Sequence, residues 1–188
     1  MKKNGLPDHA QCVFEGITFS IYQWEQKLFN GETVIFEKAM RKNSIDVVAI
    51  TEAGKILILE EEQPGREKFY GLVGGSCEGN EEPLQTAQRE LLEETGMVSD
   101  DWEGFSSHAP SSRMVYENHI FIARNCKKIQ EQSLDAGGEK IKIIEVEWNE
   151  FLEFIVSDAF RVKEFSLEVL KILYKNQEQE LKKRIFGK

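Results

Sequence analysis

The stretch that decides the fold is GGSCEGNEEPLQTAQRELLEETGM, residues 74–97. Pro83 suits the first turn of a helix and Gly96 suits the position after its last turn, so a helix is predicted over residues 83–95. Ser or Asp would be the usual residue before such a helix, but Glu82 stands there. With ~100° of rotation per residue, one side of the helix is apolar and is expected to face a core. The residues on that side are Leu84, Ala87, Leu91 and Thr95.

Three glutamates lie beside this apolar side. Glu90 and Glu94 are one helical turn apart and therefore lie one above the other, and Glu93 lies at the outer edge. Like charges at this spacing destabilise a helix by ~0.2–0.5 kcal/mol, and by more where water screens them less. A solvated acidic face is the commoner interpretation of a Glu-rich helix. The alternative is a site for a hard cation such as Mg²⁺, which takes oxygen ligands and keeps waters and substrate phosphates in its shell.

The whole chain has the composition of a globular protein. Its 188 residues are 40% hydrophobic and 30% charged, enough for one domain with a real core. The formal net charge of -9 argues against general nucleic-acid binding, and no apolar run approaches the ~20 residues of a membrane span. The N-terminal residues have no apolar segment of the secretory kind. The three cysteines show no CxxC spacing, which is typical of a reducing, cytoplasmic location.

Alternating and β-branched segments predict the remaining elements. The expected strands are residues 12–29, 33–41, two strands within 45–63 around a turn at Gly54, and then 68–75, 119–126 and 140–148. Residues 149–158 and 162–185 are each expected to form one helix. Strands interleaved with a few helices indicate a mixed α/β sandwich.

The spacing upstream of the helix decides between the two interpretations of its glutamates. Gly75 is followed after five residues by Glu81, and seven further residues lead to Arg89-Glu90 and on to Met97. This is a complete match to the Nudix box, GX5EX7REUXEEXGU, in which U is apolar. A chance match in this length is on the order of one in 10⁵ or rarer. The chain therefore resembles a Nudix hydrolase.

The resemblance implies a fold, a reaction and a set of metal ligands. The family hydrolyses a nucleoside diphosphate linked to another moiety, with Mg²⁺ or Mn²⁺, and its box forms a loop–helix–loop in an αβα sandwich with a mixed sheet. The implied metal ligands are Glu90, Glu94, Glu93 and the backbone carbonyl of Gly74. Gly75 would permit the tight loop, while Glu81 and Arg89 would hold the carboxylates of the helix in place.

Outside the box, the segments YQWEQKLFNGETVIFEK and EEEQPGREKFYGLVGG resemble the ADP-ribose and nucleoside-diphosphate-sugar pyrophosphatase branch. That branch implies an N-terminal β arm, here residues 1–43, which crosses between the subunits of a homodimer, followed by the hydrolase domain, 44–188. Arg66 is the arginine expected on the substrate phosphates. Tyr22 and Trp24 share one strand face and are expected either to stack on the nucleobase or to make a dimer or core contact.

Two further residues follow the box. Arg113, in APSSRMVYENHIF, is a candidate contact to the sugar or phosphate, although a surface position is the more frequent interpretation. Glu139 lies in the glycine-rich segment LDAGGEKIKIIEV, where the branch often carries the general base or an extra metal contact. Sequence leaves open whether Glu139 or Glu93 takes the proton from the attacking water.

The leading hypothesis is a Mg²⁺-dependent pyrophosphatase that cuts ADP-ribose, or a related nucleotide sugar, into a nucleoside monophosphate and a sugar phosphate. Two alternatives remain. One is a Nudix hydrolase of another nucleoside diphosphate derivative, and the other is a domain that senses a nucleotide sugar without hydrolysing it. The expected partners are the nucleotide sugar and a second copy of the chain.

Overall fold

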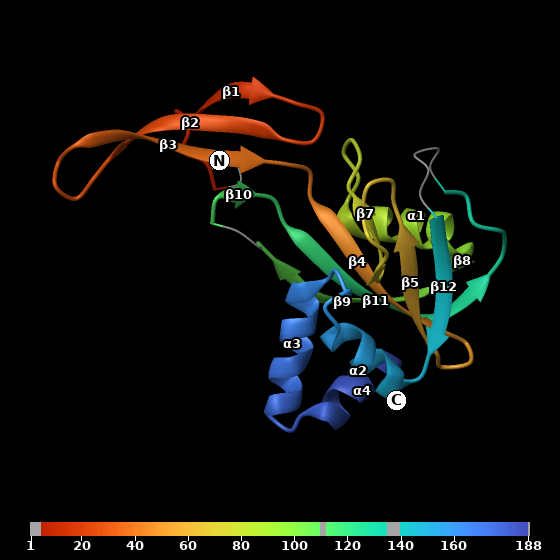
Figure 1. Cartoon of the computed structure of the whole chain (residues 1–188). Coiled ribbons are helices and arrows are strands. Elements are labelled where there is room, and N and C mark those ends of the chain that lie inside the picture. The colour runs from red at the N-terminus through yellow and green to blue at the C-terminus, as the bar shows by residue number, and fades with distance from the viewer. Residues whose placement is uncertain (1–4, 110–111, 135–139, 188) are drawn as a thin grey trace.

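The computed structural model describes residues 5–109, 112–134 and 140–187 (Figure 1). The strands are β1 (Gln11–Glu15), β2 (Ser20–Lys27), β3 (Thr33–Met40), β4 (Ser44–Thr51), β5 (Ile56–Glu62), β6 (Phe69–Gly71), β7 (Val73–Ser76), β8 (Met97–Val98), β9 (Asp101–His108), β10 (Met114–Val115), β11 (Asn118–Lys128) and β12 (Lys140–Val146). The helices are α1 (Pro83–Thr95), α2 (Trp148–Val156), α3 (Lys163–Tyr174) and α4 (Glu178–Phe186).

The larger sheet is mixed and is covered on both faces. Its central path is β12-β5-β4-β11-β8, with β6, β7 and β9 paired at its sides. The β4–β11 pair is parallel, whereas β12–β5, β4–β7 and β11–β9 are antiparallel. Helix α1 covers one face, and α2, α3 and α4 lie on the other (Figure 1). The predicted αβα sandwich with a mixed sheet is therefore confirmed.

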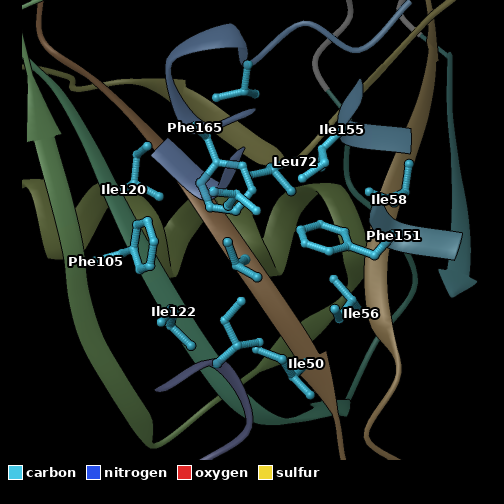
Figure 2. Close-up of a cluster of buried hydrophobic side chains, with 14 of the residues drawn as sticks. Ile50, Ile56, Ile58, Leu72, Phe105, Ile120, Ile122, Phe151, Ile155 and Phe165 are labelled. Atoms are coloured by element: carbon cyan, nitrogen blue, oxygen red, sulfur yellow. The ribbon is translucent and has the colours of Figure 1, made fainter. Parts of the chain in front are cut away.

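Alternation along the central strands explains why both faces are buried. On β4, Ile45 and Val47 pack with Leu91 of α1, whereas Val48 and Ile50 pack against the other helices. Figure 2 shows the second of these cores, in which side chains such as Phe151 and Phe165 meet the sheet. Each fully buried side chain of this size contributes ~1.5–3 kcal/mol relative to an exposed one. Strands buried on both faces appear in sequence as continuous apolar runs, as IDVVAIT does.

Helix α1 has the predicted bounds. The backbone N–H of Glu82 donates to the Gln85 side-chain oxygen at 3.0 Å, which supplies part of a capping box although no Ser or Asp is present. Gly96 ends the helix in the left-handed region with φ 70°, and its N–H donates to the Leu92 carbonyl at 2.8 Å. The expectation that Leu84 faces the core is wrong. Leu84 is 39% exposed, whereas Thr86 in the same turn is fully buried, so the buried side of the helix at its start contains Thr86 rather than Leu84.

Three other predictions need correction. Residues 68–75 form two strands rather than one, because β6 pairs with β5 whereas β7 pairs with β4. Residues 162–185 form two helices, because Asn176 adopts the left-handed region with φ 59° after α3 ends. The chain then turns back, and this return brings Leu181 and Ile185 into the same core as α3. Residues 12–29 form two strands rather than one, separated by a turn at Gly16. Strand β9 was not predicted, because its sequence DWEGFSSH is largely polar and buries only Phe105.

The N-terminal residues form a second, smaller sheet with the order β1-β2-β3-β10. In Figure 1 this arm extends away from the sandwich. Leu6, Trp24 and Val115 form its own small cluster. Strand β10 joins the arm by parallel pairing with β3, although it belongs by sequence to the following segment. The division into residues 1–43 and 44–188 stays a prediction. No helix in the described ranges is long and apolar enough to cross a bilayer.

Candidate functional site

The glutamates of α1 lie against the two glycines of β7. The Gly74 N–H donates to Glu94 Oε2 at 2.9 Å. A Cβ atom added to Gly75 would lie 1.9 Å from Glu90 Oε1, so any side chain at this position would displace that carboxylate. The loop–helix geometry therefore brings two carboxylates to consecutive positions of one strand.

Arg89 connects the carboxylates of the loop and the helix. Its guanidinium donates to Glu81 Oε1 at 3.1 Å and to Glu93 Oε2 at 2.8 Å, and Nη1 lies 3.0 Å from Glu90 Oε1. It also donates to the Ser76 carbonyl at 3.3 Å. Burial lowers the pKa of Arg89, but its bonds to Glu81 and Glu93 and the charge of Glu90 raise that pKa above its ordinary value. Arg89 is thus a fixed cation among carboxylates.

Glu81 attaches the loop to the helix. It accepts hydrogen bonds from the Arg89 guanidinium, from the Glu78 N–H at 3.2 Å and from the Thr86 hydroxyl at 2.9 Å. These bonds, led by that of Arg89, hold the pKa of Glu81 below its ordinary value. The order of residues in the motif therefore has a direct structural reason: Glu81 and Arg89 form one ion pair.

The donor set fits a hard divalent cation. Glu94 and Glu90 are 9% and 13% exposed, whereas Glu93 is 40% exposed and bonded to Arg89. Within the described ranges, no three carboxylate, imidazole or thiol groups already form a metal cage. Mg²⁺ does not require one, because it is usually held by one or two carboxylates together with waters and phosphates. Glu90 and Glu94 meet that requirement.

A pocket of about 370 Å³ opens beside β7, and we call it the arginine pocket. Three guanidinium groups line it, from segments far apart in sequence: Arg41 after β3, Arg66 after β5, and Arg161 between α2 and α3. Gly75 and Ser76 of β7 line it as well, so the pocket is continuous with the carboxylate site. Arg41 donates to the Ser76 hydroxyl at 3.4 Å and lies over the Tyr116 ring, 4.9 Å from its centroid.

A buried acid lies at the base of the arginine pocket. Asp46 pairs with Gly74 across β4 and β7, and it accepts a 2.6 Å hydrogen bond from the Asn118 side chain. Asn118 in turn accepts a 2.8 Å bond from the Ser44 hydroxyl. Burial raises the pKa of Asp46 to about 7, and the Asn118 bond only partly opposes this.

A larger pocket of about 570 Å³ lies between the arm and the sandwich. Lys38 of β3 lines one part of it, and Met114 and Val115 of β10 line another. Tyr116 borders both this pocket and the arginine pocket. The two pockets therefore adjoin at that ring.

The other predicted site residues have different positions. Trp24 is only 8% exposed, packs edge-on against Phe36 with 6.0 Å between centroids, and lies in the arm cluster with Tyr22 beside it. Among the described residues, neither aromatic lines the arginine pocket. Arg113 is exposed, and its carbonyl accepts the Ala39 N–H at 3.1 Å. Glu139 lies outside the described residues.

Sequence reasoning missed most residues of the pocket, including Asp46, Arg41 and Arg161. Asp46 had a signal, because it is the single acid within the apolar run IDVVAI. Arg41 and Arg161 had none, since surface arginines are common and both come to the pocket only through tertiary structure. Arg66 is the one arginine of the pocket that was predicted.

Comparison with known proteins gives four matches. The model of the NUDIX domain family matches residues 40–171, well over half of the chain. The chain is 28% identical over 148 residues to a "Methanol dehydrogenase activator" of Bacillus methanolicus, covering 78% of this chain and 80% of the relative. It is also 28% identical over 154 residues to an "ADP-ribose pyrophosphatase" of Bacillus subtilis (strain 168), covering 81% and 79%. A crystal structure of an ADP compounds hydrolase superposes with a TM-score of 0.70 at 18% identity, covering 90% of this chain and 94% of that one.

Proposed function

The chain belongs to the NUDIX family and is a Nudix hydrolase, and from this premise we propose that it hydrolyses ADP-ribose or a related nucleoside diphosphate sugar with Mg²⁺. The products are a nucleoside monophosphate and a sugar phosphate. One observation carries the proposal: Gly75, which lies against the Glu90 carboxylate, also lines the pocket that contains three arginines. The relative described as an ADP-ribose pyrophosphatase supports this choice of substrate.

In this proposal the protein's own groups bind and orient the diphosphate. Mg²⁺, when bound by Glu90 and Glu94, supplies charge neutralisation and Lewis-acid polarisation at phosphorus. Arg66 is exposed, and its guanidinium makes no hydrogen bond or ion pair with another described residue, so its planar donors are available for phosphate oxygens. Arg89 keeps Glu81, Glu90 and Glu93 in place and does not itself need to touch substrate.

Two glutamates are candidates for accepting the proton of the attacking water. Glu93 is bonded to Arg89, which favours its ionised form and fixes its direction. Glu139 follows a segment that is anchored to the end of α1, where the Ser133 N–H donates to the Glu93 carbonyl at 2.8 Å. Comparing the pH–rate profiles of Glu93→Gln and Glu139→Gln assigns the role, because removal of the base abolishes the acidic limb of the profile.

We also propose that the arm forms a homodimer. Large apolar side chains are exposed on two of its strands, β1 and β3. They are Val13, Phe14, Val34, Ile35 and Phe36. A second copy of the arm or of the sandwich would remove them from water.

The test of the substrate is a panel of ADP-ribose, ADP-glucose, GDP-mannose and UDP-glucose, incubated with Mg²⁺ or with EDTA and resolved by chromatography. We expect ADP-ribose or a related member to yield a nucleoside monophosphate and a sugar phosphate, with no product in EDTA. Absence of product from every member with Mg²⁺ would overturn the proposal.

A second candidate is a hydrolase of another nucleoside diphosphate derivative. The observation that favours it is the activator relative, which is as similar to this chain as the pyrophosphatase is but is described by a different role. Extending the panel to nicotinamide dinucleotides and dinucleoside polyphosphates separates the two candidates. Tight binding of a nucleotide sugar without product would instead identify a sensor.

A further inference from the structure

The backbone around Arg161 is held firmly against the sandwich. Its N–H donates to the Tyr70 carbonyl at 2.8 Å, and the Tyr70 N–H donates to the Ala159 carbonyl at 2.9 Å. Between them Phe160 is fully buried in the core. The side chain of Arg161 therefore starts from a fixed point at the rim of the arginine pocket.

The guanidinium of Arg161 is positioned but not saturated. It lies over the Phe69 ring, 5.2 Å from the centroid, and its Nη1 is 3.8 Å from Glu61 Oε2, near the outer limit of an ion pair. The side chain is 50% exposed, and the guanidinium donates no hydrogen bond to any described residue. Its planar donors are thus directed by an aromatic face and remain available to an anion.

The pocket holds more guanidinium groups than a diphosphate needs. The charge of a divalent cation would be balanced by Glu90 and Glu94, while the two charges of the diphosphate would be balanced by Arg41 and Arg66, each of which can take one phosphate group in a bidentate manner. Arg161 is then in excess. The pocket also presents Asp46 and Glu164 as hydrogen-bond acceptors, which suit hydroxyl groups of a sugar.

We propose that Arg161 is a substrate-binding residue that selects substrates carrying an anionic group beyond the diphosphate. The substrate class is a nucleoside diphosphate sugar with a further phosphate or carboxylate. This inference rests on the proposed function and narrows it. Either the nucleoside or the released sugar can carry the extra group, and the experiment separates these two sources.

The experiment uses two substrate pairs that differ by one anionic group. UDP-glucuronic acid and UDP-glucose differ on the sugar, and 2′-phospho-ADP-ribose and ADP-ribose differ on the nucleoside. For one pair, we expect the anionic member to have the lower KM with the wild-type protein. Arg161→Ala should raise that KM by about tenfold to a hundredfold, with a far smaller change in the KM of the member that lacks the extra group and in kcat. Compared with Arg161→Ala, Arg161→Lys should recover part of the preference for the substrate with the extra anionic group. Lysine supplies the positive charge but lacks the planar pair of donors of the guanidinium.

The matched control is Lys171→Ala, which removes a cation from an exposed position on α3 that does not line the arginine pocket. It should leave the KM ratio of each pair unchanged. Equal KM values within both pairs for the wild-type protein, or equal losses for both members in Arg161→Ala, would overturn the inference while leaving hydrolysis established.

If the proposed function is wrong, no substrate is cleaved at all, and this outcome differs from the loss of selectivity described above. If no substrate is cleaved, calorimetric titration of 2′-phospho-ADP-ribose and UDP-glucuronic acid in EDTA tests Arg161 without turnover. Binding that weakens in Arg161→Ala but not in Lys171→Ala supports the inference. Binding that is the same in both variants overturns it.

Discussion

The carboxylate helix and the N-terminal arm differ in how far along the chain their contacts reach. The loop and helix at residues 74–96 are held largely by contacts among themselves, such as Gly75 against Glu90 and Glu81 with Arg89. The arm closes its small cluster only when Val115 meets Trp24, and it leaves apolar side chains exposed on β1 and β3. The carboxylates of the loop and helix are held by local contacts, whereas the arm requires distant segments and, in our proposal, a second copy.

The largest expected effect belongs to the local region. Glu94→Gln should lower kcat by about a thousandfold or more, because it removes the charge of a proposed metal ligand. The glutamine oxygen can still accept the Gly74 N–H, so the melting temperature should change little. Turnover measured across a Mg²⁺ titration, together with thermal unfolding, checks both statements.

The control for that change is Glu153→Gln, which neutralises an exposed glutamate on α2 away from the site. It should keep wild-type turnover. If Glu94→Gln were equally active, Glu94 would not be a metal ligand.

The next effect tests the close approach of backbone and carboxylate. Gly75→Ala places a methyl carbon 1.9 Å from Glu90 Oε1, and the carboxylate must move. A shift of about 1 Å at a reacting centre costs on the order of a hundredfold in rate. We therefore expect that loss in kcat/KM, together with weaker Mg²⁺ dependence.

Gly104→Ala is the matched control, because a Cβ at Gly104 in β9 would meet no heavy atom within 4 Å. Both variants make the same chemical change, so any general effect of replacing a strand glycine cancels. Activity that falls equally in the two would show that the contact with Glu90 is unimportant.

Asp46 lies on β4, where the chain passes from the arm into the sandwich. Because its carboxyl is buried, we expect the free energy of unfolding to depend on pH. Its folded pKa of about 7 is above its ordinary value of 3.8, so the stabilisation it gives is complete at low pH and is lost as pH rises through about 7. Asp46→Asn keeps an acceptor for Asn118 but cannot ionise. Between pH 5 and pH 8 the variant should gain roughly 2 kcal/mol of unfolding free energy relative to wild type.

Urea unfolding in EDTA at several pH values measures this difference without interference from a bound metal. A constant difference between variant and wild type over the whole range would mean that Asp46 ionises normally in the folded protein.

The contrast between local and distant contacts also explains what sequence could predict. The bounds of α1 followed from Pro83 and Gly96, and the mixed sandwich followed from strand-like segments interleaved with helical ones, because both depend on neighbours in sequence. The break at Asn176 was missed, since residues 162–185 keep a helical apolar pattern on both sides of it. Arg161 was missed for another reason: its position in the pocket depends on contacts with Phe69 and Glu61, which are far from it in sequence.

The smallest effect on turnover is expected from a change in the arm. This change tests whether the arm binds a second copy of the chain. Ile35→Glu places a charge in the exposed apolar surface of β3 and should prevent burial of that surface by a second copy. Light scattering should then give a molar mass near 21.7 kDa for the variant and about twice that for wild type. We expect kcat to stay within about twofold, because the carboxylate helix is complete in one chain.

Leu170→Glu, an equivalent change on the exposed face of α3, should leave the mass of the dimer unchanged. A wild-type protein that is already monomeric at high concentration would contradict the dimer, and the exposed side chains of the arm would then need a different partner.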